Sequence, residues 1–166
     1  METTNKPQTL PSLAEVIRAG GVQHDIRGVS KGTVLRAALD TLRLPAEIDT
    51  GFLLNVLLAR EELASTAVGD GIAIPHVRNP MAVTLTYSMV ALCFLEHPVD
   101  FGALDGVPVY CLFLVISPDV RTHLHLLSRI ALVLRDEQFK ALLARRATRD
   151  EVLQRIEQLE RGIPVK

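Results

Sequence analysis

Apolar residues recur at helical spacing in six segments of the chain. Ser30 suits the N-cap of the second segment, and Pro45 limits the start of the third. Thr148 and Glu151 form a capping box at the start of the last segment. The predicted helices cover residues 11–17, 30–42, 46–63, 117–134, 136–145 and 148–161.

Runs rich in β-branched and aliphatic residues separate these helices and predict strands at 22–26, 84–95 and 107–116. The last run is almost continuously apolar, which is typical of a strand buried on both faces. Cys93 and Cys111 lie inside two of these runs. We therefore expect two buried free thiols rather than a disulfide.

One short stretch, residues 68–76, combines a turn, an extended run and a histidine. Gly69 and Gly71 tolerate positive φ and so permit a tight turn. Three apolar residues then lead into Pro75, whose fixed φ and missing N–H group usually end a regular element. His76 is thus predicted at the end of an extended segment, where an imidazole can act as a nucleophile or base. Taken alone, an ordinary histidine at a strand end remains the simpler interpretation.

Arg60 is predicted to lie on the inner face of its helix. Its angular position falls between Val56 and Leu53, whereas Glu61 and Glu62 are expected to point elsewhere. A guanidinium on a buried face needs an anion or a carboxylate to offset its desolvation. The alternative, which geometry alone favours, is an arginine whose head reaches water.

His123 falls within the predicted apolar stripe of the helix at 117–134. The stripe consists of Val120, Leu124, Leu127, Ile130, Ala131 and Leu134. His125 lies about 200° away on the same helix and is expected on the solvent side. The two imidazoles therefore cannot bind one metal ion together. A core histidine bonded to a backbone carbonyl is the alternative interpretation of His123.

Composition narrows the class of protein. The 166-residue length indicates one domain, and 48% hydrophobic with 22% charged residues is ordinary for a globular chain. The net charge of -1, from 18 basic and 19 acidic residues, argues against a non-specific nucleic-acid binder. The polar N-terminus does not resemble a signal peptide, and no apolar run approaches the roughly 20 residues of a membrane span. We therefore expect a cytoplasmic protein that does not insert into a membrane.

Several of these residues could form one small pocket. The candidates are Arg60, Ser65, Thr66, Gly69, Gly71, His76 and His123. They supply an imidazole nucleophile, a cation, hydroxyl groups and backbone amides, which are the parts needed to receive a phosphoryl group. The spacings of a P-loop, a nucleophile elbow and common metal sites are missing, so no metal and no cofactor is expected.

The segment from Glu61 to His76 reads Glu-x6-Val-Gly-x2-Ile-Ala-Ile-Pro-His. It resembles the signature of mannitol/fructose-type enzyme IIA domains of the bacterial phosphoenolpyruvate-dependent phosphotransferase system, and the nitrogen-regulatory type is the nearest branch. The resemblance extends from about residue 11 to 160. Further matches in order and spacing lie at 58–61, 65–66, 98–101, 105–109 and 122–125.

This resemblance implies an α/β fold, a single compact domain with a central mixed β-sheet flanked by α-helices. We expect the domain at 11–161, after a flexible N-terminal segment at 1–10 and before a C-terminal tail at 162–166. It further implies that His76 accepts phosphate from the histidine-containing phosphocarrier protein. His123 matches the second active-site histidine and Arg60 the arginine beside it. The residues expected to support the phosphate pocket are Ser65, Thr66 and Gly71.

Three functional hypotheses follow. The first is a phosphoryl carrier in a nitrogen-type regulatory role. The second is a regulatory binding module that controls a partner, such as a sensor kinase, a potassium transporter or a sugar permease subunit, through its phosphorylation state or presence. The third is a scaffold that has lost transfer. Val77 motivates it, because the family usually has a small residue there and a branched side chain could narrow the approach to the imidazole or alter a backbone donor.

Overall fold

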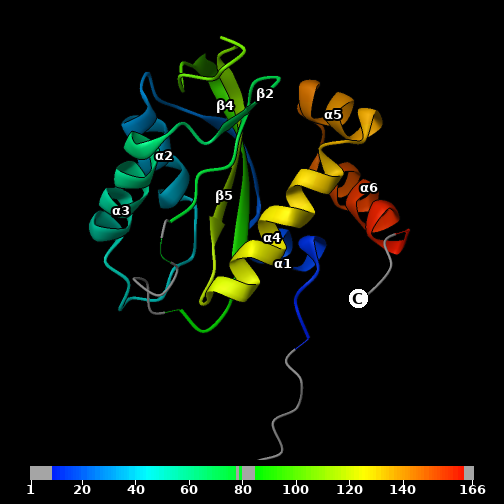
Figure 1. The fold of residues 1–166 in the computed structure, drawn as a ribbon, viewed down its shortest axis with the longest axis horizontal. Helices are drawn as coiled ribbons and strands as arrows, with labels where there is room; N and C mark the ends of the chain where they lie inside the picture. The colour runs from blue at the N-terminus through cyan, green and yellow to red at the C-terminus, as the bar shows by residue number, and fades with distance from the viewer. Residues whose placement is uncertain (1–8, 78, 80–84, 163–166) are drawn as a thin grey trace, which may run out of the picture.

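A five-stranded sheet forms the middle layer of the molecule, and helices cover both of its faces (Figure 1). This computed structural model describes residues 9–77, 79 and 85–162. The strands are β1 (Val22–Ile26), β2 (Ala67–Gly69), β3 (Ile72–Ala73), β4 (Met89–Val99) and β5 (Val109–Ile116). The helices are α1 (Leu13–Gly20), α2 (Lys31–Asp40), α3 (Thr50–Leu63), α4 (Val120–Val133), α5 (Glu137–Ala144) and α6 (Arg149–Arg161).

The sheet is mixed, in the order β1-β4-β5-β3-β2. The pairs β1–β4 and β3–β5 are parallel, whereas β4–β5 and β2–β3 are antiparallel. Strand β5 lies at the centre, and all of its residues except Tyr110 are buried. This burial explains its almost continuously apolar sequence. The expected α/β domain with a central mixed sheet is confirmed.

Two hydrophobic cores lie on opposite faces of this sheet. One packs α2 and α3 against the sheet, through residues such as Leu35, Leu53 and Leu57. The other packs α1, α4, α5 and α6 against the opposite face, through residues such as Ile17 and Ile130. The two cysteines are free and buried as expected, one in each core.

Helix caps follow the sequence closely. The Ser30 side chain accepts a hydrogen bond from the N–H group of Thr33, and Thr148 caps α6 with the predicted capping box. Helix α3 begins at Thr50 rather than near residue 46, because Asp49 caps it by accepting from the N–H group of Phe52.

The bounds of one strand and of the terminal segments differ from, or lie outside, what the structure describes. Strand β4 runs to Val99, beyond the predicted end at residue 95, because Val99 still pairs with Val109. The predicted start of that strand at residue 84 lies outside the described residues, as do residues 1–8 and 163–166 of the predicted terminal segments. In the described part of the chain, no helix has both the length and the apolar character needed to cross a membrane.

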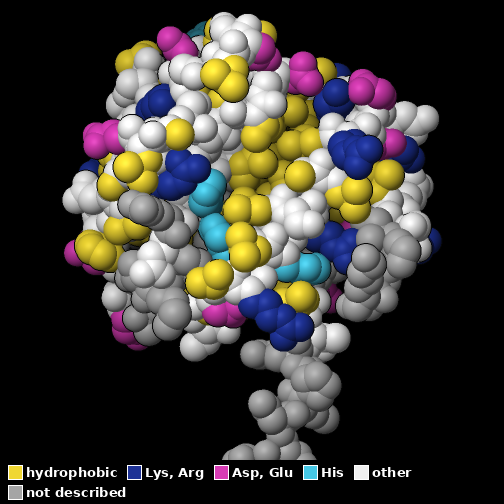
Figure 2. All heavy atoms as spheres, viewed as in Figure 1, with side chains coloured by type: hydrophobic (Ala, Val, Ile, Leu, Met, Phe, Trp, Pro, Cys, Tyr) yellow, Lys and Arg dark blue, Asp and Glu magenta, His cyan; other side chains and the backbone are white. Residues whose placement is uncertain are grey.

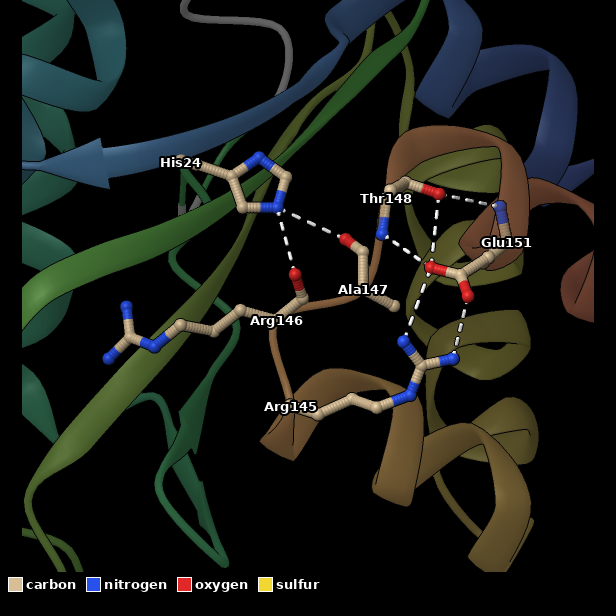
Figure 3. Close-up of polar contacts among 6 residues, drawn as sticks. All are labelled: His24, Arg145, Arg146, Ala147, Thr148 and Glu151. Carbon is tan, nitrogen blue, oxygen red and sulfur yellow. Dashed lines mark hydrogen bonds and ion pairs between the residues drawn. The ribbon is translucent and has the colours of Figure 1, made fainter.

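His24 joins edge strand β1 to the connection between α5 and α6 (Figure 3). Its Nε2 lies 3.1 Å from the carbonyl oxygen of Arg146 and 3.0 Å from that of Ala147. Since carbonyls only accept, Nε2 carries the proton. Arg145, in the same connection, forms an ion pair with Glu151 of α6. This histidine therefore holds the helical layer to the sheet edge.

Gly20 lets α1 approach the sheet closely. A Cβ atom at this position would lie 2.2 Å from the carbonyl oxygen of Val90 in β4. Such a distance is impossible without moving one backbone relative to the other. The glycine is therefore required by the packing of the helix against the strand.

We predict that Gly20→Ala lowers the free energy of unfolding by about 1–3 kcal/mol, because the added methyl group overpacks the boundary between α1 and β4. Urea unfolding followed by circular dichroism measures the change. Gly32→Ala in α2 is the matched control, since its Cβ would meet nothing within 4 Å. The control should be neutral or stabilising by up to about 1 kcal/mol. Equal stability of the two variants would contradict the prediction.

Candidate active site

His76 lies where the sheet pairing resumes after a break. Regular strand β3 ends at Ala73, and His76 then forms an isolated parallel bridge with Val115 of β5. The N–H group of Val115 donates to the carbonyl of Pro75 at 2.9 Å. The central strand therefore positions the backbone on which this histidine stands, and the predicted place after an extended segment is correct.

The imidazole of His76 is held by its own backbone. Its Nδ1 lies 2.7 Å from the carbonyl oxygen of Ile74. Because a carbonyl only accepts, Nδ1 carries the proton and Nε2 keeps its lone pair. Burial lowers the pKa of His76, and the charge of Arg60 lowers it further, against opposing contributions from the Ile74 carbonyl and Glu61. The ring is therefore neutral and nucleophilic at Nε2 near pH 7.

His123 faces His76 from the first turn of α4. The two ring centroids are 5.1 Å apart and the ring planes are tilted by 50°. His123 is buried, and its Nδ1 lies 3.3 Å from Oγ of Ser117. Burial lowers the pKa of His123 to about 4, and the neighbouring His76 contributes in the same direction. The inward orientation predicted for this histidine is confirmed.

The rest of the α4 prediction needs correction. The buried residues are Thr122, His123, Leu126, Ile130 and Val133. Three members of the predicted stripe, Val120, Leu124 and Ala131, are exposed instead. His125 is not on the solvent side, because it is partly buried with its Nε2 2.9 Å from the carbonyl of Pro11. Packing against α1 and the sheet has rotated the buried face relative to the apolar pattern.

Arg60 lies in the last turn of α3. Its Nη1 donates to the carbonyl of Ala64 at 2.8 Å, and its side chain is partly exposed. The inner face predicted for it belongs to Glu61, which continues the buried line of Leu53 and Leu57 at intervals of four residues and is only 4% exposed. The expectation that Glu61 points elsewhere is wrong. Arg60 nevertheless lies near enough to lower the pKa of His76.

Ser65, Thr66 and Gly71 were predicted to support a phosphate pocket. The structure places the first two in the loop after α3 and Gly71 elsewhere. Thr66 donates from its N–H and Oγ1 to Glu61, and its carbonyl accepts from Ile74, so it supports the segment leading to His76. The Oγ of Ser65 accepts from the N–H group of Ala67 at 3.1 Å. Both therefore organise the loop after α3.

Gly71 lies away from the two histidines. Its carbonyl accepts from the N–H group of Tyr110, whereas His76 pairs with Val115. Five residues along β5 correspond to about 16 Å. Gly71 has a φ of 77°, and a Cβ there would lie 2.5 Å from Cδ1 of Tyr110. It therefore shapes the turn between β2 and β3 and is not brought to the imidazoles.

Val77 does not obstruct the imidazole. Its side chain is 0% exposed and packs in the core that contains Leu53 and Leu57. Successive side chains of an extended segment point to opposite faces, so Val77 points into the core beneath the sheet. The expectation that a branched residue narrows the approach to His76 is wrong.

Histidine side chains reach the surface together on one face of the molecule, beside a basic side chain and among apolar ones (Figure 2). The local chemistry consists of two neutral imidazoles and one guanidinium. No group of His, Cys, Asp and Glu residues suited to a metal ion occurs in the described part of the chain. Side chains of this composition can bind a tetrahedral anion beside a nitrogen nucleophile.

Residues 15–159 match the model of the phosphoenolpyruvate-dependent sugar phosphotransferase system, EIIA 2. The chain therefore belongs to this family of enzyme IIA domains. It is 36% identical over 154 residues to a nitrogen regulatory protein of Pseudomonas aeruginosa, a match covering 90% of this chain and 97% of the relative. The nitrogen-regulatory resemblance seen in the motif is thus confirmed.

Solved structures agree with this assignment. The nitrogen regulatory protein IIA-Ntr from Neisseria meningitidis superposes with a TM-score of 0.75 at 27% identity, covering 87% of this chain and 98% of its own. The mannitol IIA of Escherichia coli superposes with a TM-score of 0.68 at 22% identity, covering 83% of this chain and 96% of its own. The second likeness shows the fold alone.

The buried carboxylate of Glu61 lies at this site and was not predicted from the sequence. Its signal was present, because Glu61 is the first residue of the motif that ends at His76. Helical spacing from Leu53 and Leu57 also points to it. Arg60 was assigned to the inner face in its place, because adjacent residues differ by only about 100° around a helix.

We predict that His123 makes folding stability depend on pH. Its pKa is about 4 in the folded protein and 6.5 ordinarily, so the unfolded chain binds this proton more readily. The resulting stability is complete above about pH 6.5 and is lost as the pH falls toward 4. Between pH 7 and 5 the loss from this residue is about 1–2 kcal/mol. Urea unfolding of wild type and His123→Gln at both pH values measures it, and an equal loss in both proteins would contradict the prediction.

Proposed function

We propose that His76 accepts a phosphoryl group at Nε2 from the phosphohistidine of the histidine-containing phosphocarrier protein. The observation that carries this proposal is the 2.7 Å hydrogen bond from Nδ1 to the Ile74 carbonyl, which leaves the Nε2 lone pair available. A new N–P bond forms at Nε2 as the donor's N–P bond breaks. The donor nitrogen retains the electron pair of the broken bond.

Arg60 and His123 have different roles in this transfer. Arg60 supplies the positive charge that offsets the negative charge of the phosphoryl oxygens. His123 remains neutral because its pKa is about 4. In this proposal Nδ1 of His123, 3.3 Å from Oγ of Ser117, accepts from that hydroxyl, and the Nε2–H group is the donor to a phosphoryl oxygen. No proton has to leave His76 during the step.

Exposed apolar side chains beside the site support a protein as the phosphoryl donor. Val120 and Leu124 flank His123 on α4 and are 49% and 60% exposed. Leu63, one turn from Arg60 on α3, is 61% exposed. Exposed aliphatic residues around a polar centre are typical of a protein interface. This surface therefore suits docking of the phosphocarrier protein.

We predict that the purified chain, incubated with the donor proteins and phosphoenolpyruvate, gains one acid-labile phosphate. His76→Ala should abolish the labelling, because it removes the nucleophile. His24→Ala is the control and should be labelled normally, since His24 bonds the carbonyls of Arg146 and Ala147. Intact mass spectrometry at neutral and acidic pH measures the phosphate. Retention of the label in His76→Ala would rule out the assignment.

A regulatory binding role is the second candidate. Similarity to a nitrogen regulatory protein over 90% of the chain favours it. In this role the phosphorylation state of His76, or the presence of the protein, controls a partner such as a sensor kinase or a potassium transporter. A sugar permease subunit as the partner would instead indicate a role in transport.

The phosphorylation state should change partner binding if the role is regulatory. We predict that a sensor kinase or potassium transporter is retained by one state of the immobilised protein and released by the other. The phosphorylated wild type is compared with His76→Ala, which stays unphosphorylated. Quantitative binding to each purified candidate is the measurement. Equal binding of both states, or binding of a sugar permease subunit alone, would contradict regulation by phosphorylation.

A further inference from the structure

We propose that Glu61 is a positioning residue for phosphoryl transfer, because its buried carboxylate holds Thr66 and thereby the segment that orients the imidazole of His76. This inference rests on the proposed function, since it assumes that His76 is the acceptor. Glu61 itself does not touch the phosphoryl group. It acts through the backbone between Thr66 and His76.

The carboxylate of Glu61 is buried and fully engaged. Thr66 donates to it twice, from its N–H group to Oε1 at 3.0 Å and from Oγ1 to Oε2 at 2.6 Å. The Nζ of Lys31 donates to Oε1 at 3.1 Å. A buried charge is tolerated only when it is paired and hydrogen-bonded, and this one meets both conditions. Such an arrangement rigidly defines the position of Thr66.

A continuous series of hydrogen bonds connects Thr66 to the nucleophile. The carbonyl of Thr66 accepts from the N–H group of Ile74 at 3.0 Å. The carbonyl of Ile74 then accepts from Nδ1 of His76 at 2.7 Å. Displacement of Thr66 therefore moves the carbonyl that selects the tautomer. Hydrogen bonds in a series also polarise one another, which strengthens this connection.

Glu61 and its neighbour Arg60 act on His76 in opposite directions. The charge of Glu61 raises the pKa of His76, whereas that of Arg60 lowers it. The carboxylate thus moderates the effect of the guanidinium that faces the incoming phosphoryl group. Loss of Glu61 should lower the pKa of His76 and weaken the preference for a proton on Nδ1.

A purely structural role for Glu61 is the alternative. Lys31 is the first residue of α2, and its ion pair with Glu61 therefore connects α2 to α3. The Nζ of Lys31 also lies 5.4 Å from the ring centroid of Phe101. The connection between α2 and α3 alone would affect folding stability and leave the imidazole of His76 unchanged. The two roles therefore differ in what happens to the ring in the folded protein.

The test compares Glu61→Gln with Glu62→Gln, which removes an exposed carboxylate from the next position of the same helix. Nitrogen NMR of histidine-labelled protein reads the tautomer and pKa of His76, and a phosphotransfer assay gives the rate. Glu61→Gln should mix the two tautomers, lower the pKa of His76 and slow phosphorylation about tenfold or more. Glu62→Gln should match the wild type in all three measurements.

Two further variants keep the test decisive if Glu61→Gln does not fold. Thr66→Val removes the Oγ1 donor and should shift the tautomer and slow transfer, whereas Thr66→Ser retains the hydroxyl and should restore both. Wild-type tautomer, pKa and rate in the folded Glu61 and Thr66 variants would overturn the proposal. A label retained in His76→Ala would instead overturn the proposed function, while the tautomer and pKa of His76 would still report on Glu61.

Discussion

The hydrogen bond between His76 Nδ1 and the Ile74 carbonyl determines which nitrogen of this imidazole can react. It places the proton on Nδ1 and leaves the lone pair on Nε2. The carbonyl is itself held in place, because Ile74 bonds to Thr66 and the following Pro75 bonds to Val115 of the central strand. The chemistry of this partly buried ring therefore depends on the most deeply buried strand of the sheet.

The electrostatics of the site follow from partial burial. Burial lowers the pKa of both His76 and His123, so neither ring is charged near pH 7. Two charged imidazoles 5.1 Å apart would repel each other, and a protonated nucleophile would have no lone pair. Arg60 then provides the positive charge that neither histidine supplies. This division between neutral rings and one permanent cation suits reversible transfer of an anionic group.

The exposed apolar residues on α4 explain a failure of pattern analysis. Val120 and Leu124 have the spacing of core residues, yet they face solvent on either side of His123. A helix that packs on a core and also exposes apolar side chains to solvent carries apolar residues on two faces. The apolar spacing includes residues of both faces. The buried stripe that it predicts is therefore rotated about the helix axis relative to the observed buried face.

The sequence by itself determined the helices, the buried strand β5, the family and the position of His76. These features depend on local periodicity, on capping residues such as Ser30, and on a motif contained in one short segment, from Glu61 to His76. Their physical causes act over short distances, and composition and spacing therefore reveal them.

Only the tertiary structure decided which side chains meet at the site. It buried Glu61 rather than Arg60, separated Gly71 from His76, and turned Val77 into the core. The rotation of a helix against a sheet is set by packing of whole faces, which neighbouring residues in the sequence do not specify. The pairing of Ile72, Ala73 and His76 with a strand some 40 residues later is equally non-local, and it positions His76.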